Sequence, residues 1–439
     1  MTHPDRRFWF VLGGILVAAL VVRVVFVQTV ARHDDGFYDA FYYELQADAN
    51  ADGQWFQVPA LSDLAPGPAA DHPPLTALVL TPIAVVKRTG NQIFMRYATV
   101  LFGLGTVFVI GLLGREVGGV RVGWVAAAIA AVYPYLWVND GLIMSESLAA
   151  LLTVTAVLLA YRLARSRAVG VAVALGAVCG LAALTRAELV LLAPLFVLPI
   201  ALRDRQSRPA IERWRPAGIV VGVTVAVLVP WIAWNTVRFD RPVLISTNEG
   251  IALAGSSCDE AFYGGGTGLT GLTCLSDPPA GVDQSVASAE YRVDAVRYIS
   301  DNLGRYPAVL ASRVGRTWSV FRPFDMLGFN EGEGRPRWVT ALGLWFYYPL
   351  LLLAVGGVIL MIRAARSVWP LVVPAIVVTL GVIPAFGQTR FRVPAEPSLV
   401  VLAAVALVWI VGRVGRVGRV GSAGAGRATL ADPVSAEVT

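Results

Sequence analysis

The sequence contains few charged residues and almost no lysine. Asp, Glu, Lys and Arg make up 15% of the 439 residues, 56% are hydrophobic, and Lys87 is the only lysine. So little polar side-chain area cannot cover the surface of a soluble protein of this length. The mean hydropathy of +0.64 agrees with this. The composition therefore excludes a soluble globular protein and indicates an all-α polytopic membrane protein.

Cysteine and histidine are also scarce, with three residues of each. Three cysteines exclude a disulfide-rich scaffold, although Cys258 and Cys274 share one polar segment and can pair if that segment lies outside. The net charge of +6 and the pI near 9.4 would suggest nucleic acid in a soluble domain. Here the arginines lie at the ends of apolar segments, where they set membrane orientation instead.

Apolar runs that are long enough, or nearly long enough, to span a bilayer predict about ten transmembrane helices. They begin near Phe8, Arg96, Val122, Glu146, Ala168, Leu189, Pro216, Val339, Val368 and Ser398. The first run continues to Val30 without a small-residue cleavage site, so we expect a retained anchor. Arg23 within it is expected to snorkel or to pair with another helix. The arginine clusters fall on one side if the N-terminus is cytoplasmic, which predicts that both termini lie inside.

The short apolar run from Leu75 to Val86 is not expected to cross the membrane. A crossing would invert every later helix and place the arginine-rich segment from Arg203 to Arg215 outside, against the charge rule. We therefore predict an interfacial helix on the outer face. Within a membrane domain of residues 1–412, the polar sequence then falls mainly into a first outer loop, 31–95, and one long outer loop, 236–338. We expect residues 413–439 to form a disordered cytoplasmic tail.

Several unusual polar residues come to the same outer side once this topology is fixed. They are Asp39, Asp71, His72, Glu146, Arg186, Glu188, Arg390 and Arg392. Acids at this depth are costly unless they pair, bind a ligand or take part in chemistry. A transporter would be expected to place its polar groups in broken helices near the midplane, with repeated halves, and we find neither pattern in the sequence.

Carboxylates and arginines at a membrane surface suit sugar transfer from a lipid-phosphate donor. The acceptor hydroxyl needs a general base, which a partly buried carboxylate can provide. The departing lipid phosphate needs cationic and hydrogen-bond stabilisation, which arginines and a histidine provide. A single base with no carboxylate nucleophile predicts one displacement, which inverts the anomeric centre.

Three motifs of the first polar region carry a family resemblance. They are Asp39-Ala40-Phe41-Tyr42-Tyr43, Asp52-Gly53-Gln54-Trp55-Phe56 and Asp71-His72-Pro73-Pro74-Leu75. Weaker matches are Met144-Ser145-Glu146, Leu184-Thr185-Arg186-Ala187-Glu188 and Arg390-Phe391-Arg392-Val393-Pro394. The pattern resembles the GT-C superfamily of polyprenyl-phosphate-sugar glycosyltransferases, with the bacterial aminoarabinose transferases and the protein O-mannosyltransferases as the nearest comparison.

The resemblance implies that Asp39 is the catalytic base, with Asp34 and Asp35 as fallback candidates. The residues expected to bind substrate are Asp35, Tyr42, Tyr43, Asp71, His72, Glu146, Arg186, Arg390 and Arg392. The position of His72 is often lysine in the aminoarabinose branch. Asp71 lies where the family often has a carboxylate that lines the site or binds a metal. No cofactor is certain, and a divalent ion held by Asp71 and His72 stays open.

The implied partners are a polyprenyl-phosphate sugar donor, a glycan, lipid or protein acceptor, and membrane lipid, but not nucleic acid. The implied location is the plasma membrane, with the active site facing outside. A lipid or solute transporter or flippase with an outer acidic site is the alternative, and a non-catalytic assembly subunit is a third reading.

The individual residues also have structural alternatives. Asp39 is suited to N-cap a short helix. Glu146 can pair with Arg96 or Arg186, and Arg186 with Glu188. Arginines 390 and 392 can contact lipid headgroups.

Overall fold

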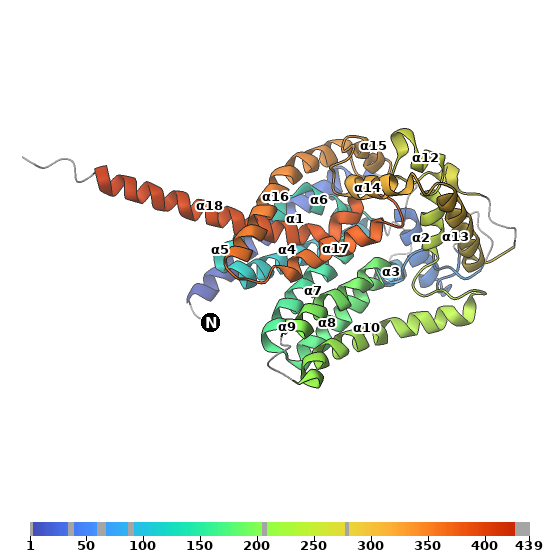
Figure 1. Cartoon of the computed structure of the whole chain (residues 1–439), viewed down its shortest axis with the longest axis horizontal. Helices are drawn as coiled ribbons and strands as arrows, with labels where there is room; N and C mark the ends of the chain where they lie inside the picture. The colour runs from blue at the N-terminus through green and yellow to red at the C-terminus, as the bar shows by residue number, and fades with distance from the viewer. Residues whose placement is uncertain are drawn as a thin grey trace, which may run out of the picture.

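The computed structural model describes residues 3–33, 39–58, 67–86, 92–203, 209–276 and 281–425. These residues confirm the all-α prediction: they form helices and no strand, and one isolated bridge pairs Gln57 with Pro68. The long helices run roughly side by side in a bundle, and the shorter helices gather at one end of it (Figure 1).

Within the described part of the chain, six helices are long and apolar enough to span a bilayer. They are α1 (His3–Thr29), α4 (Gln92–Gly118), α7 (Glu146–Ser166), α10 (Ala210–Arg238), α16 (Arg337–Arg363) and α18 (Glu396–Ala425). A seventh span results if α5 (Val120–Val132) and the segment from Pro134 to Gly141, which meet at 60°, count as one. Pro134 begins the short α6 (Pro134–Trp137) at this bend, where its ring cannot continue the preceding helix.

The remaining apolar helices are shorter. They are α3 (Leu75–Val86), α8 (Val169–Ala183), α9 (Leu192–Arg203), which follows the 3-10 helix η3 (Ala187–Leu191), and α17 (Trp369–Val382). Each of the ten predicted apolar runs corresponds to one helix. The number of helices that cross the membrane stays a prediction. With 12 residues, α3 is about 18 Å long, against a hydrocarbon core of about 30 Å. The interfacial position of α3 stays a prediction.

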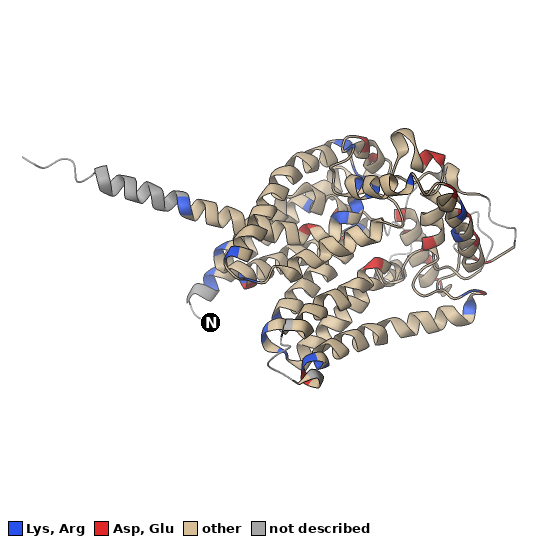
Figure 2. Ribbon diagram, in the orientation of Figure 1, with Lys and Arg blue, Asp and Glu red and all other residues tan. Residues whose placement is uncertain are grey.

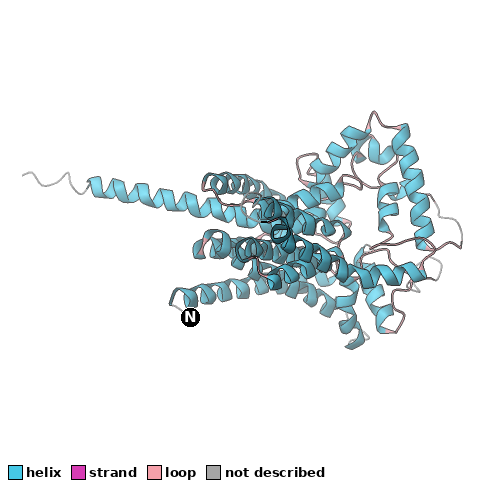
Figure 3. Cartoon of the chain, turned by 60° about the horizontal axis from the view of Figure 1, so that its bottom comes forward, coloured by secondary structure: helices cyan, strands magenta, loops and turns pink. Residues whose placement is uncertain are grey.

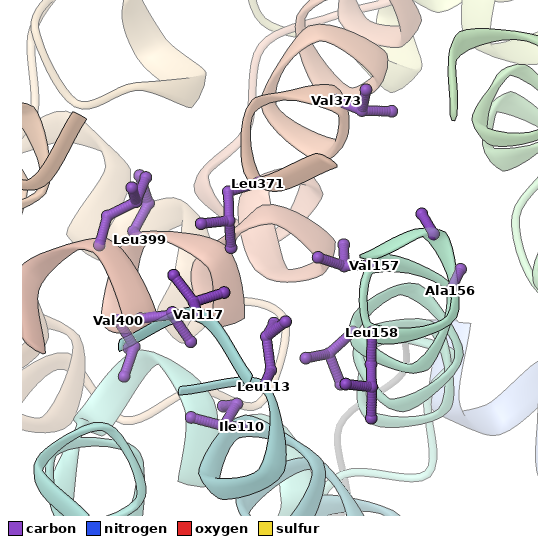
Figure 4. Close-up of a cluster of buried hydrophobic side chains, with 14 of the residues drawn as sticks. Ile110, Leu113, Val117, Ala156, Val157, Leu158, Leu371, Val373, Leu399 and Val400 are labelled. Carbon is purple, nitrogen blue, oxygen red and sulfur yellow. The ribbon is translucent and has the colours of Figure 1, made fainter. Parts of the chain in front are cut away.

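The interior of the bundle is an apolar cluster to which α4, α7, α17 and α18 contribute. Figure 4 shows Ile110, Leu113 and Val117 of α4 facing Leu158 of α7 and Val400 of α18. Close packing between neighbouring helices rests on small residues as well. A Cβ atom on Gly114 would lie 2.9 Å from the Cα of Gly123, so the backbones of α4 and α5 meet here without side chains between them.

A buried ion pair joins α1 to the bend after α6. The Nε of Arg23 lies 2.7 Å from Oδ2 of Asp140, and the Ser147 hydroxyl donates to the other carboxylate oxygen at 2.6 Å. Arg23 was expected either to snorkel or to pair with another helix, and the structure shows that it pairs, with Asp140. The expected tail also differs in part: α18 continues to Ala425, beyond residue 413, because no proline interrupts the helix there.

The region from residue 236 to 338 is folded, rather than one long loop. It contains α11 (Asn248–Gly255), α12 (Asp259–Phe262), α13 (Gln284–Asp301), α14 (Tyr306–Thr317) and α15 (Asp325–Glu331). Asp283 caps α13 by accepting hydrogen bonds from the backbone N–H groups of Ser285 and Val286. A disulfide joins Cys258 to Cys274. Figure 3 shows these helices and their loops at one end of the bundle. We call this end, with α2 (Asp39–Ala51), the polar end.

Candidate functional site

A cavity of about 530 Å³ lies at the polar end and brings together residues from across the sequence. Its polar and charged lining residues are Asp39, Tyr43, His72, Ser145, Thr185, Arg186, Glu188, Ser246, Asn248, Glu249, Arg292 and Arg390. Its apolar wall includes Leu191, Val378, Leu380, Val382 and Pro384. Apolar lining residues therefore come from η3, from α17 and from the segment after it, and α2, α11 and α13 contribute charged and polar ones.

The closest charged pair in this cavity is Asp39 with Arg390. A terminal guanidinium nitrogen of Arg390 donates to the Asp39 carboxylate at 2.7 Å. Burial favours the neutral carboxyl, but the positive charges of Arg390 and His72 outweigh it and hold the pKa of Asp39 well below its usual range. Asp39 is the first residue of α2, yet its carboxylate is engaged by a side chain from the far end of the sequence. The carboxylate is thus ionised and faces the cavity.

The aromatic residues of α2 hold His72 beside this pair. The imidazole packs against the rings of both Tyr42 and Tyr43, with ring centroids 4.7 and 5.2 Å away. Its Nε2 is 3.9 Å from the Asp39 carboxylate. His72 and Tyr43 line the cavity, whereas Tyr42 packs behind them. The two tyrosines thus contact the histidine from α2.

Glu146 lies behind the cavity as a counter-ion shared by three arginines. Its side chain is 1% exposed, and its Oε1 lies 3.5 Å from Arg186, 3.7 Å from Arg335 and 3.8 Å from Arg390. Neither oxygen has a hydrogen-bond partner among the described residues. Arg96 and Arg186 were the expected partners of Glu146, and the structure places Arg186 beside it. The expected pair of Arg186 with Glu188 is also present, at 2.7 Å.

Arg335 and Glu333 belong to this network, and sequence reasoning missed both. Glu333 lies 3.0 Å from Arg335 and 3.4 Å from Arg390. Arg335 also donates to the amide oxygen of Asn139 at 3.0 Å. A signal was present, because both residues lie just before an apolar run. The acids and arginines of that region were too numerous to rank by sequence alone.

Asp71 is half-buried next to the cavity, but it does not line it. Its carboxylate accepts a hydrogen bond at 3.0 Å from the amide of Gln284, at the start of α13. Burial raises the pKa of Asp71 above its usual value, although His72 and the hydrogen bond from Gln284 partly offset this. Among the described residues, no three His, Cys, Asp or Glu side chains are grouped to hold a metal ion.

Arg392 lies apart from the cavity, unlike Arg390. Its guanidinium is fully buried in the bundle, where it pairs with Glu396 and lies 3.7 Å from the centre of the Tyr347 ring. Both arginines belong to the 3-10 helix η6 (Thr389–Ala395). With about three residues per turn, side chains two positions apart point to different sides. Arg392 is therefore a buried residue of the bundle core. It had been expected among the substrate-binding residues, but it does not line the cavity. Asp35, and its neighbour Asp34, lie outside the described residues.

The segment before η6 is fixed by the folded region from α11 to α15. The backbone N–H of Gly387 donates to the carbonyl of Gly268 at 2.8 Å, and a Cβ on Gly387 would lie 2.1 Å from the carbonyl oxygen of Arg313. Arg313 in turn donates to the carbonyls of Ile383 and Ser256. A glycine is therefore needed at position 387, and this contact sets where Arg390 enters the cavity.

The geometry defines a polytopic membrane protein with a charged cavity at one end of its bundle. A family model described as dolichyl-phosphate-mannose-protein mannosyltransferase matches residues 71–234. No protein with curated annotation is a significant sequence match to the chain.

Several solved structures are similar. The oligosaccharyltransferase AglB from Archaeoglobus fulgidus, in complex with an inhibitory peptide and a dolichol-phosphate, aligns over 99% of this chain and 53% of that one. The TM-score is 0.58 and the identity 13%. A structure of the Archaeoglobus fulgidus oligosaccharyltransferase tethered with an acceptor peptide gives a TM-score of 0.57 and 15% identity over 97% and 52% of the two chains. The present chain thus spans about half the length of these proteins.

ArnT from Cupriavidus metallidurans bound to undecaprenyl phosphate aligns at 18% identity over 91% of this chain and 77% of that one, with a TM-score of 0.45. At this score the alignment does not establish a common fold. At 13% sequence identity, the similarity to AglB concerns the fold alone. Together with the family match, it confirms the resemblance to the GT-C superfamily.

Proposed function

We propose that the protein is a membrane glycosyltransferase of the GT-C type that transfers a sugar from a polyprenyl phosphate to an acceptor. The observation that carries this proposal is one cavity in which a carboxylate and two guanidinium groups, Asp39, Arg186 and Arg390, meet beside an apolar helical wall. A lipid phosphate needs such a combination, since its headgroup is anionic and its chain is apolar.

In the proposed reaction the acceptor oxygen attacks the anomeric carbon as the bond from that carbon to the phosphate oxygen breaks. The lipid phosphate leaves with the bonding electron pair, and Asp39 takes the proton of the acceptor hydroxyl. Arg186 and Arg390 stabilise the charge of the departing phosphate. Because the transfer uses one displacement, the product has the opposite anomeric configuration to the donor.

The pair of Asp39 with Arg390 has a consequence for this mechanism. A carboxylate whose pKa is held low by a guanidinium is a weak base. A donor phosphate bound at Arg390 would compete with Asp39 for the same N–H donors and would neutralise the same positive charge. The pKa of Asp39 would then rise, so that the base becomes effective only when the donor is bound.

The two outer helices offer a surface for the acceptor. Arg292 of α13 and Glu249 of α11 form an ion pair that lines the cavity opposite its apolar wall. The donor chain would lie against the apolar wall, and the acceptor would approach past this pair. The AglB structure, which contains both a dolichol-phosphate and a peptide, supports two ligands at such a site.

The proposed location is the plasma membrane, with the cavity on the outer face. Arginines lie at both ends of the bundle (Figure 2). The support for the orientation is the set of arginines that flank the apolar runs at the end opposite to the cavity, among them Arg115, Arg121, Arg165 and Arg366. By the charge rule, arginines at such connections favour a cytoplasmic location for that end, which supports the proposed orientation.

The decisive experiment incubates purified protein with a polyprenyl-phosphate sugar and an acceptor extract, and follows the release of free polyprenyl phosphate. Release that requires the acceptor supports transfer. Movement of the intact donor between leaflets without release supports the alternative, a flippase, because a flippase breaks no bond. The same assay with a chelator tests whether a divalent ion, with Asp71 and His72 as candidate ligands, takes part.

A further inference from the structure

A second cavity lies at the end of the bundle opposite to Asp39. Its volume is about 390 Å³, and it lies between the C-terminal ends of α4 and α16 and the middle of α18. The residues that line it are Val117, Leu360, Met361, Arg363, Ala364, Arg366, Val405, Trp409 and Arg413. Nothing in the proposed transfer reaction uses this cavity, since α4, α16 and α18 all run away from the polar end towards it (Figure 1).

The charges of this cavity are not balanced. Three arginines line it, and none of its described lining residues is acidic. Arg366 donates to the backbone carbonyl of Val117 at 2.6 Å, and Arg413 lies 4.4 Å from the centre of the Trp409 ring. Arg363 has no hydrogen-bond or ion-pair partner within the described part of the chain. In the Asp39 cavity, by contrast, Arg186 and Arg390 each have a carboxylate at 2.7 Å.

An adjacent cavity shows how an arginine at this end of the bundle can be paired with an acid. This adjacent cavity shares Val117 and Arg366 with the cavity that Trp409 lines. It also contains Glu116, which pairs with Arg165 at 2.8 Å. Unlike Arg165, Arg363 and Arg413 have no acid among the described residues that line their cavity, so an anion bound there would meet positive charge that no carboxylate neutralises.

The rest of the cavity wall is apolar. Leu360 and Val405 form it, and Trp409 lies at its edge with 41% of its surface exposed. A free phosphate ion would leave this wall uncovered. A phospholipid covers it with an acyl chain while its phosphate meets the arginines, and tryptophan favours this headgroup level of a bilayer.

We propose that this cavity binds an anionic phospholipid, with its phosphate among Arg363, Arg366 and Arg413 and an acyl chain along Leu360 and Val405. The bound lipid joins the C-terminal end of α16 to the middle of α18. The proposal does not rest on the glycosyltransferase function, since it concerns the other end of the molecule.

The test uses the full-length protein in detergent, with phosphatidylglycerol and phosphatidylcholine as probes, and measures retained lipid by native mass spectrometry and the apparent melting temperature. The wild type should retain phosphatidylglycerol at least tenfold more than phosphatidylcholine, and its melting temperature should rise with the former only. The variant Arg363→Gln/Arg413→Gln should lose both effects. It spares Arg366, whose bond to Val117 contributes to folding. Arg121→Gln, an exposed arginine that does not line the cavity, is the matched control and should behave as the wild type.

Equal retention of the two lipids would overturn the proposal, as would unchanged retention in the double variant. An equal stabilisation by inorganic phosphate alone would show a site for a free anion and would also overturn it. Retention is measured on whatever fraction of the variant is folded, so a lower yield does not prevent the comparison.

Discussion

The guanidinium of Arg390 lies 2.7 Å from the carboxylate of Asp39, although 351 residues separate them in the sequence. This pair closes the polar end of the bundle, because it joins the start of α2 to the segment that leads into α18. It also places the candidate base and a candidate phosphate ligand within one hydrogen bond of each other.

Replacing the base should stop transfer without preventing donor binding. For Asp39→Asn we expect a fall in kcat on the order of 100-fold to 10,000-fold, since the amide cannot accept the acceptor proton. The donor Kd should stay within a few fold of wild type, because Arg186 and Arg390 remain. The measurements are release of polyprenyl phosphate and direct donor binding. Asp294→Asn removes an exposed acid of α13 and is the matched control. Near-normal release by the Asp39 variant would remove this residue from the role.

Replacing Arg390 should change the pH dependence of the reaction. In the free enzyme Arg390 and His72 hold the pKa of Asp39 low. Arg390→Gln removes the positive charge that has the larger effect on Asp39. The pKa of the carboxyl should therefore rise, and the acid limb of the pH profile of kcat/KM should move to higher pH. The donor KM should increase as well. An acid limb at the same pH in both enzymes would contradict the assignment, whatever the change in KM.

Replacing Glu146 should destabilise the fold. The buried carboxylate is shared by Arg186, Arg335 and Arg390, so Glu146→Gln leaves their positive charge less well compensated. A loss of about 3 kcal/mol is expected for breaking a buried ion pair of this kind. The apparent melting temperature in detergent measures it, with the exposed Glu290→Gln as control. If the melting temperature is unchanged while the donor KM rises, Glu146 acts on the ligand instead.

Asp71→Asn should not destabilise the protein near neutral pH. Burial raises the pKa of Asp71 in the folded state, so the wild type loses stability as pH rises from the ordinary pKa of about 4 through the raised value. The asparagine does not ionise, and its carbonyl oxygen can still accept from Gln284. We expect the variant to equal or exceed the wild type in melting temperature at neutral pH and to lose this advantage towards pH 4. A variant that is markedly less stable at neutral pH would show that the ionised form is required.

The sequence predicted the helices of the bundle because hydrophobic length is a local property. Each of the ten apolar runs contains enough consecutive apolar residues to form a helix on its own. The motif around Asp39 and His72 was found for a similar reason, since Asp39 and the tyrosines that hold the histidine lie within one short segment. Such features need no knowledge of distant contacts.

Only the tertiary structure decided which charged residues meet. The two neighbouring arginines of η6 looked alike in sequence, yet Arg390 reaches the cavity and Arg392 is buried against Tyr347. The turn of a 3-10 helix separates them, and the contact of Gly387 with Arg313 sets its position. The position of Arg335 beside Glu146 likewise depends on tertiary packing, because the two residues are far apart in the sequence. Ion pairs between distant segments depend on how the helices pack, whereas helix formation in a membrane follows from local hydrophobicity and backbone hydrogen bonding.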